Sequence, residues 1–280
     1  MSRKNHNPIS WVPTVYFAMG LPFVVLNMVS VLMFKGLGIG DAQIALWTSL
    51  IMMPWTLKFL WSPFLEMFKT KKFFVVLTQM VTGAGFALVA LALQLPVFFA
   101  VCIALLAVIA FSGATHDVAT DGVYMSELSK QDQAKYIGWQ GAFYNIAKIV
   151  ASGGLVWLAG ALLVGFGGVE GATEAVRYEA TRHAWMTVML ILAAVMLLLG
   201  FYHIRMLPSG GAAATGAVRC QVGKGDVGAV GGGNQGFLLE EAHLVLYSVH
   251  YPLSPCRGLC HEDCPPFPEG GAFGRRLGTE

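Results

Sequence analysis

Charged residues are scarce in this sequence. Of its 280 residues, 12% are Asp, Glu, Lys or Arg, whereas 56% are hydrophobic. Soluble domains usually contain about 25% charged residues, so the composition predicts a chain whose main partner is the lipid bilayer. The net charge is only +2, and no basic stretch is interleaved with aromatic residues. We therefore expect no nucleic-acid partner.

Motifs of common enzyme classes are also lacking. The sequence has no nucleotide-binding P-loop, no H-E-x-x-H and no nucleophile elbow. We therefore expect no enzymatic activity and no cofactor. Four of the five cysteines fall in the last 61 residues. The fifth, Cys102, lies in an apolar run and is expected to pack there as a buried thiol.

Long apolar stretches dominate residues 1–208. A helix needs about 20 apolar residues to cross a hydrocarbon layer of roughly 30 Å. Six stretches meet this length: residues 11–34, 43–64, 73–93, 97–118, 136–164 and 183–206. Short connections predict antiparallel neighbours, so the expected fold is an all-α, six-helix transmembrane bundle.

The distribution of Lys and Arg between the connections predicts the orientation of these spans. Eight lie on the side of the N-terminus and three on the other side, so we expect a multi-pass protein with a cytoplasmic N-terminus. The eight are Arg3, Lys4, Lys69, Lys71, Lys72, Lys130, Lys135 and Arg205, and the three are Lys35, Arg177 and Arg182.

Cysteine labelling tests this orientation. In a background without native cysteines, a cysteine introduced into residues 165–182 is expected to react with a membrane-impermeant maleimide in intact cells. A cysteine introduced into residues 69–72 is expected to react only after permeabilisation. The reverse pattern of labelling would overturn the orientation.

Polar side chains inside a span are costly, and by default they mark a pathway or a paired contact. The deepest is Lys148, roughly 18 Å into its span at 1.5 Å per residue. Gln140 and Tyr144 precede it at intervals of four, on one helix face, and Asn145 lies beside them. Asn27 is midway along the first span. We expect these residues to line a substrate pathway, with Lys148 binding an anionic group of a small molecule. The alternative is structural: Lys148 pairs with a carboxylate, and Asn27 makes a helix–helix hydrogen bond.

A second polar group lies near the cytoplasmic ends of the second and fourth spans. Asp117 and Asp121 are four residues apart, with His116 adjacent. Like charges this close favour the uptake of a proton by one of them, and histidine titrates near neutrality. Lys58 is followed by Glu66. We expect these residues to act in gating or proton coupling. The alternative is that Lys58 only extends to the interface and the carboxylates form structural salt bridges.

Two motifs resemble those of a known transporter group. K-F-L-W-S-P-F-L-E at 58–66 matches K-x-x-W-x-P, and A-T-H-D-V-A-T-D-G at 114–122 matches T-x-D-x-x-x-D. With six spans and a basic loop between the second and third, the chain resembles the N-terminal half of the major facilitator superfamily, and within it the anhydromuropeptide permease group. The loop L-E-M-F-K-T-K-K departs from the superfamily pattern because it lacks the glycines and the arginine.

The resemblance implies a secondary active transporter of a bacterial inner membrane. Such a protein moves a small solute, here a cell-wall sugar–peptide, by proton-coupled alternating access. Two other interpretations stay open. One is a six-span membrane anchor that does not transport and whose tail binds a metal or a partner. The other is a complete six-span transporter that works as a dimer.

The sequence changes character in residues 209–280. From Gly210 to Glu280 there are 15 glycines and neither methionine nor tryptophan, so we expect an irregular tail. One interpretation is a zinc site, whose ligands would be Cys256, Cys260, His261 and Cys264. This cluster lacks the two separated ligand pairs of a structural zinc site, so we expect no metal there.

The other interpretation of the tail is translation out of frame, which we favour. Codons for residues 253–269, each read from its second base, permit the string Y-R-L-A-E-G-F-V-M-K-I-A-P-L-F-L. This string resembles the start of the seventh helix in the same permease group.

Overall fold

The structure is a computed structural model of the chain, and it describes residues 7–63, 65 and 70–210. All of these belong to the first of two units of the chain, Met1–Arg219. The predicted gating residue Glu66 lies outside the described residues. So do the second unit, Cys220–Glu280, and the four cysteine and histidine positions considered for zinc.

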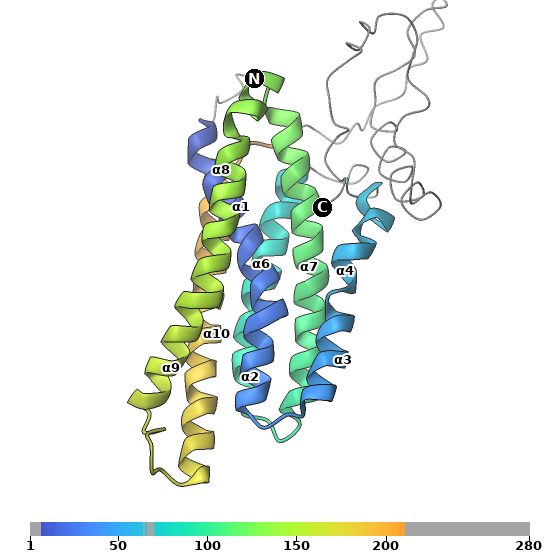
Figure 1. Cartoon of the computed structure of the whole chain (residues 1–280). Coiled ribbons are helices and arrows are strands. Elements are labelled where there is room, and N and C mark those ends of the chain that lie inside the picture. Colours follow the sequence, from blue (N-terminus) through green and yellow to red (C-terminus); the bar gives the residue numbers. More distant parts are fainter. Residues whose placement is uncertain (1–6, 64, 66–69, 211–280) are drawn as a thin grey trace, which may run out of the picture. The chain divides into compact units, whose positions relative to one another are not determined.

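The described residues are helical and contain no strand, which confirms the all-α prediction for this part of the chain. The elements in Figure 1 are α1 (Pro8–Val24), η1 (Val25–Val29), α2 (Ser30–Gly36), α3 (Asp41–Ile51), α4 (Met53–Leu57), η2 (Lys58–Leu60), α6 (Lys71–Ala92), α7 (Phe98–Glu127), α8 (Lys130–Ile149), η3 (Val150–Leu155), α9 (Val156–Gly165) and α10 (Glu174–Met206). Here η1 and η3 are π-helical, and η2 is a 3₁₀ turn.

Among the residues that the structure describes, five helices are long and apolar enough to cross a membrane. They are Pro8–Gly36, Lys71–Ala92, Phe98–Glu127, Lys130–Gly165 and Glu174–Met206. Several extend beyond the predicted apolar stretches because their first turns are polar and capped. Ser129, for example, caps α8 by accepting from the amide of Asp132 at 3.2 Å.

The predicted span over residues 43–64 is not one continuous helix, so the predicted count of six is not confirmed. The chain forms α3, α4 and η2 there, with a break at Met52. Pro54 explains the break, because proline has no amide hydrogen and its ring collides with the carbonyl four residues earlier in a continuous helix. These segments lie along α7, at one edge of the bundle (Figure 1).

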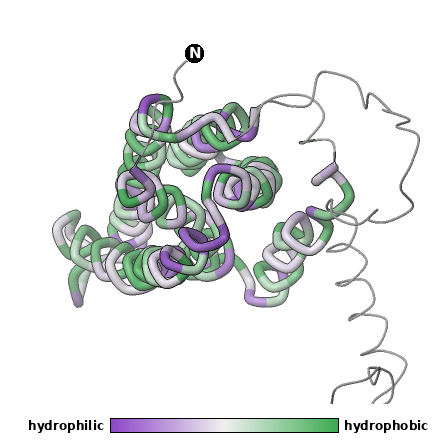
Figure 2. Tube along the Cα trace, turned by 90° about the horizontal axis from the view of Figure 1, so that it is seen from above, coloured by the Kyte–Doolittle hydropathy of each residue, from purple (hydrophilic) through white to green (hydrophobic). Residues whose placement is uncertain are grey.

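Seen along the helix axes, the long helices lie side by side (Figure 2). α6 packs against α7 and α10, and α1 packs against α8 and α7. Glycines allow the closest approaches. A β-carbon placed on Gly20 of α1 would lie 2.8 Å from the Cβ of Ala147 in α8, and one on Gly85 of α6 would lie 2.6 Å from the Cγ1 of Ile109 in α7.

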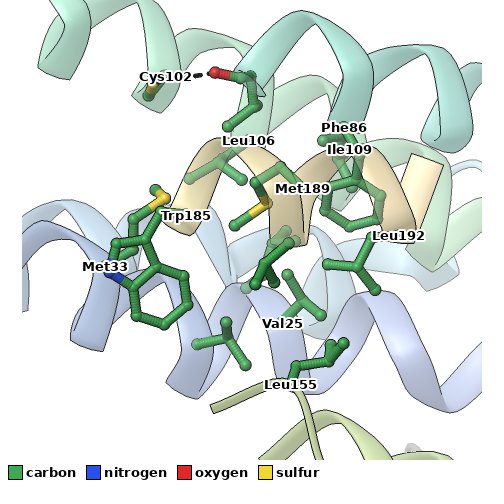
Figure 3. Packing of buried hydrophobic residues seen from close by; sticks show 14 of the residues in the cluster. Val25, Met33, Phe86, Cys102, Leu106, Ile109, Leu155, Trp185, Met189 and Leu192 are labelled. Atoms are coloured by element: carbon green, nitrogen blue, oxygen red, sulfur yellow. Dashed lines mark hydrogen bonds between the residues drawn. The ribbon is translucent and has the colours of Figure 1, made fainter. Parts of the chain in front are cut away.

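The apolar core fills the space between these helices. Buried side chains from α6, α7, α10 and the first helix form it, and Figure 3 shows several of them. Cys102 is fully buried in this core, and its thiol lies 4.0 Å from the carbonyl oxygen of Val89. The expectation that Cys102 is a packing residue agrees with this position.

Both π-helical segments lie at the contact between the first and fifth predicted spans. η1 and η3 touch each other. Each has a serine whose hydroxyl donates to a carbonyl four residues earlier: Ser30, directly after η1, to Leu26 at 2.7 Å, and Ser152, inside η3, to Lys148 at 2.8 Å. Such side-chain bonds compete with the regular helical ladder and bend helices.

Candidate functional site

A cavity of about 410 Å³ with both polar and apolar lining residues opens between α1, η2, α7 and α8. It lies toward the end of the bundle where α7 ends and α8 begins. Five of the predicted site residues line it, together with Tyr16, which the sequence analysis did not select. The polar lining residues are Tyr16, Lys58, Asp117, Asp121, Gln140 and Tyr144.

One aromatic donor holds each carboxylate of the cavity. The indole Nε1–H of Trp55 donates to Oδ2 of Asp117 at 2.9 Å. The hydroxyl of Tyr16 donates to Oδ1 of Asp121 at 2.9 Å. Both donors are neutral, so they orient the carboxylates and leave their charge uncompensated.

The position of Trp55 depends on a glycine of α7. A β-carbon on Gly113 would lie 2.8 Å from Cζ2 of the Trp55 ring, so only glycine leaves room for the indole. Gly113, Asp117 and Asp121 follow at intervals of four and share one helix face. The same face therefore accepts the ring and receives its hydrogen bond.

The charge opposite the two carboxylates is Lys58. Its ammonium acts electrostatically on both Asp117 and Asp121. Within the described ranges, Lys58 forms no direct ion pair with a carboxylate, so it faces the pair across the cavity. The three groups sum to one negative charge when both carboxylates are ionised, and one added proton makes the group neutral.

The polar stripe of α8 extends from the cavity toward the middle of its long helix. Gln140 and Tyr144 line the cavity, and Lys148 follows one turn later. The Lys148 ammonium lies 4.6 Å from the centre of the Tyr144 ring and 6.0 Å from that of Phe23, which are cation–π distances. Among the residues that the structure describes, no carboxylate pairs with Lys148.

Three predicted pathway residues do not line this cavity: Lys148, which lies one turn beyond it, Asn145 and Asn27. Asn145 is exposed and donates to the carbonyl of Gly141 in its own helix at 2.9 Å. Asn27 is exposed within η1. The structure therefore does not place either amide with the other predicted pathway residues.

His116 is also separate from the cavity, although the sequence places it next to Asp117. Consecutive residues of an α-helix point about 100° apart, so His116 turns toward α6. There its Nε2 lies 3.0 Å from Nε2 of Gln79. The predicted grouping of His116 with the two carboxylates is therefore not found in the structure.

Sequence reasoning missed Tyr16 and Trp55. Each is an ordinary aromatic residue in an apolar segment, and each reaches an aspartate that is 105 or 62 positions away. The one local signal is the interval of four from Gly113 to Asp117, which marks a close helix approach beside a charged group.

A second hollow, of about 500 Å³, lies between residues 36–38 and the start of α10. Its charged side chains, Glu174, Arg177 and Glu179, are exposed. Solvated charges of this kind do not converge on a ligand, so this hollow is a weaker candidate than the cavity.

No protein-family model and no curated protein matches the chain. The class of protein therefore follows from the fold: a helical protein whose described part contains five helices able to cross a membrane.

Proposed function

We propose that the chain is the N-terminal half of a proton-coupled secondary transporter of the inner membrane, similar to the major facilitator superfamily. The observation that supports this most directly is the pair Asp117 and Asp121, which shares one cavity with Lys58 inside a helical bundle. Ionisable groups in such a position are costly and generally serve ion or substrate movement.

The charge balance of this group supports a coupling role. With both carboxylates ionised, closing the cavity would bury a net negative charge, which is strongly unfavourable. Binding of one proton removes that charge, so closure follows protonation. This is the linkage that a proton-driven alternating-access cycle requires.

Lys148 supplies a second element of the proposal. Its ammonium rests on aromatic rings, so its charge is available to an anionic group of a small solute. The resemblance suggests a cell-wall sugar–peptide, whose carboxylate would take this place. In a twelve-span parent, a second half would complete the site between the two bundles.

The nucleotide sequence around codon 209 tests whether a second half belongs to this protein. We expect a single-base insertion or deletion there to restore a frame that encodes further apolar spans. The first of these would contain Y-R-L-A-E-G-F-V-M-K-I-A-P-L-F-L or a near variant. A shifted frame that soon meets stop codons, or that encodes a polar stretch, would refute the frame disruption.

Uptake into proteoliposomes tests transport. Under an imposed inward proton gradient, the frame-restored chain is expected to accumulate a radiolabelled anhydromuropeptide, and the chain as given is not. Equal uptake by both would favour the six-span dimer. The absence of uptake by the frame-restored chain, in vesicles that hold a gradient, would contradict transport of this solute class.

Replacing Lys148 by methionine is expected to reduce uptake by the frame-restored chain at least about 10-fold, the loss of one charge-assisted contact of about 1.5–3 kcal/mol. Lys135→Met is the matched control, because Lys135 belongs to the same helix, is exposed and lies over the Tyr136 ring at 5.3 Å. Equal uptake by the two variants would remove Lys148 from the pathway.

A further inference from the structure

A second polar assembly crosses the interior on the face of α7 that turns away from the cavity. It consists of Thr14 (α1), His203 (α10), Gln79 (α6), and His116 and Thr120 (α7), and we call it the histidine relay. Gln79, His203 and Thr120 have 0% exposure, and His116 has 3%. Thr14 is only partly buried, so the relay joins four helices and is buried except at its Thr14 end.

Hydrogen bonds connect the members in sequence. Thr14 Oγ1 lies 2.9 Å from Nε2 of His203, whose Nδ1 lies 2.9 Å from Oε1 of Gln79. Nε2 of Gln79 lies 3.0 Å from Nε2 of His116, whose Nδ1 lies 3.5 Å from Oγ1 of Thr120. The central amide thus presents its oxygen to one imidazole and its nitrogen to the other.

With both imidazoles neutral and the Gln79 amide in this orientation, only one assignment of donors and acceptors satisfies all of these bonds. The amide NH₂ group of Gln79 can only donate, so Nε2 of His116 must accept. The Gln79 oxygen can only accept, so Nδ1 of His203 must carry a hydrogen. Nε2 of His203 then accepts from the hydroxyl of Thr14.

A proton on His203 fits this arrangement with one small change. Its Nδ1–H continues to donate to Gln79, while the new Nε2–H donates to Thr14. The Thr14 hydroxyl then donates to the carbonyl of Trp11, which lies 3.1 Å away. Every polar atom keeps a partner.

A proton on His116 requires a different arrangement. Its new Nε2–H would face the Gln79 nitrogen, so two donors would oppose each other until the amide turns over. The turned amide then donates to Nδ1 of His203, which must be neutral. Two imidazolium rings would both need the oxygen of Gln79, and this amide has only one.

The surroundings of the relay contain few charges that act on it. From α6, the positive charge of Lys72 opposes a proton on His203, and a charged His203 opposes a proton on His116. The Tyr202 ring of α10 lies 5.5 Å from that of His203, and its hydroxyl donates to Ser10. From α7, Asp117 and Asp121 face the cavity, and α1 contributes the uncharged Thr14.

We propose that the histidine relay is a buried proton-binding site that takes up one proton and no more. The incoming proton forms an N–H bond at Nε2 of either His203 or His116, and the orientation of the Gln79 amide differs between the two states. This inference does not depend on the proposed transport.

Nitrogen NMR of the whole chain in detergent micelles, with ¹⁵N-labelled histidine, tests the proposal. As the pH is lowered from 8 while the chain stays folded, the imidazolium fractions of His116 and His203, assigned with His116→Gln and His203→Gln variants, are expected to rise to a sum of one proton per chain and no further. Two imidazolium rings in the folded wild type, or none, would overturn the proposal.

The variant Gln79→Glu provides the matching test. A carboxylate has two oxygens of similar reach, so it can accept from both rings at once. The proton count of the relay is expected to rise from one to two in this variant. A count that stays at one in the folded variant would show that the amide is not the limiting group. If the variant fails to fold, the wild-type count alone decides.

Discussion

Asp117→Asn is expected to lower proton-driven uptake by the frame-restored chain by at least about 100-fold, which corresponds to about 2.7 kcal/mol. Asparagine keeps the shape of the side chain and an oxygen for the indole of Trp55. It cannot bind a proton, however, and it leaves Lys58 facing a single carboxylate. The measurement is the initial rate of uptake under an imposed pH gradient.

Two comparisons separate coupling from folding for this variant. Exchange of solute without a pH gradient is expected to persist, whereas a structural defect would remove both activities. The control is Asp41→Asn, because Asp41 is exposed at the other end of the bundle, 3.2 Å from Lys35. Its uptake is expected to stay within about two-fold of wild type, as for a surface ion pair. Undiminished uptake by Asp117→Asn would exclude Asp117 from coupling.

The second large effect is expected from Gly20→Ala. The new methyl group would lie 2.8 Å from Cβ of Ala147 and 2.8 Å from the carbonyl oxygen of Tyr144, so α1 and α8 would have to separate. We expect the free energy of unfolding to fall by about 1–3 kcal/mol, the usual cost of overpacking. Thermal unfolding of the chain in detergent measures this loss.

Gly160→Ala is the matched control, since a β-carbon at Gly160 meets nothing within 4 Å. Alanine is the better helix former by about 1 kcal/mol, so this variant is expected to be as stable as wild type or more stable. If both variants behaved alike, the contact between α1 and α8 would not be limited by the size of residue 20.

Apolar length was sufficient to locate the five long helices from the sequence. It was insufficient for their ends, because the first turns of α8 and α10 are polar. The break in residues 43–64 has a local cause, Pro54, and a count of apolar residues does not register it. An interior proline alone is not decisive either, because Pro13 and Pro22 lie inside the continuous α1.

The site was predictable to the extent that it depends on spacing within one helix. The intervals of four in α7 and α8 predicted that Asp117 shares a helix face with Asp121, and that Gln140 shares one with Tyr144. Contacts between helices were not predictable, because nothing near Tyr16 in the sequence indicates Asp121. His116 shows the converse error, since neighbours in sequence point in different directions on a helix.

The two π-helical segments place extra residues in the first and fifth spans. A π turn holds one residue more than the α-helical turn that it replaces. If η3 rewound to α-helix, the residues beyond it would advance by about 1.5 Å and turn by about 100°. Leu155, now buried in η3, would then leave the core, and another side chain would take its place. Because η1 touches η3, a change from π-helix to α-helix in one of these segments would also displace the other, next to Lys148.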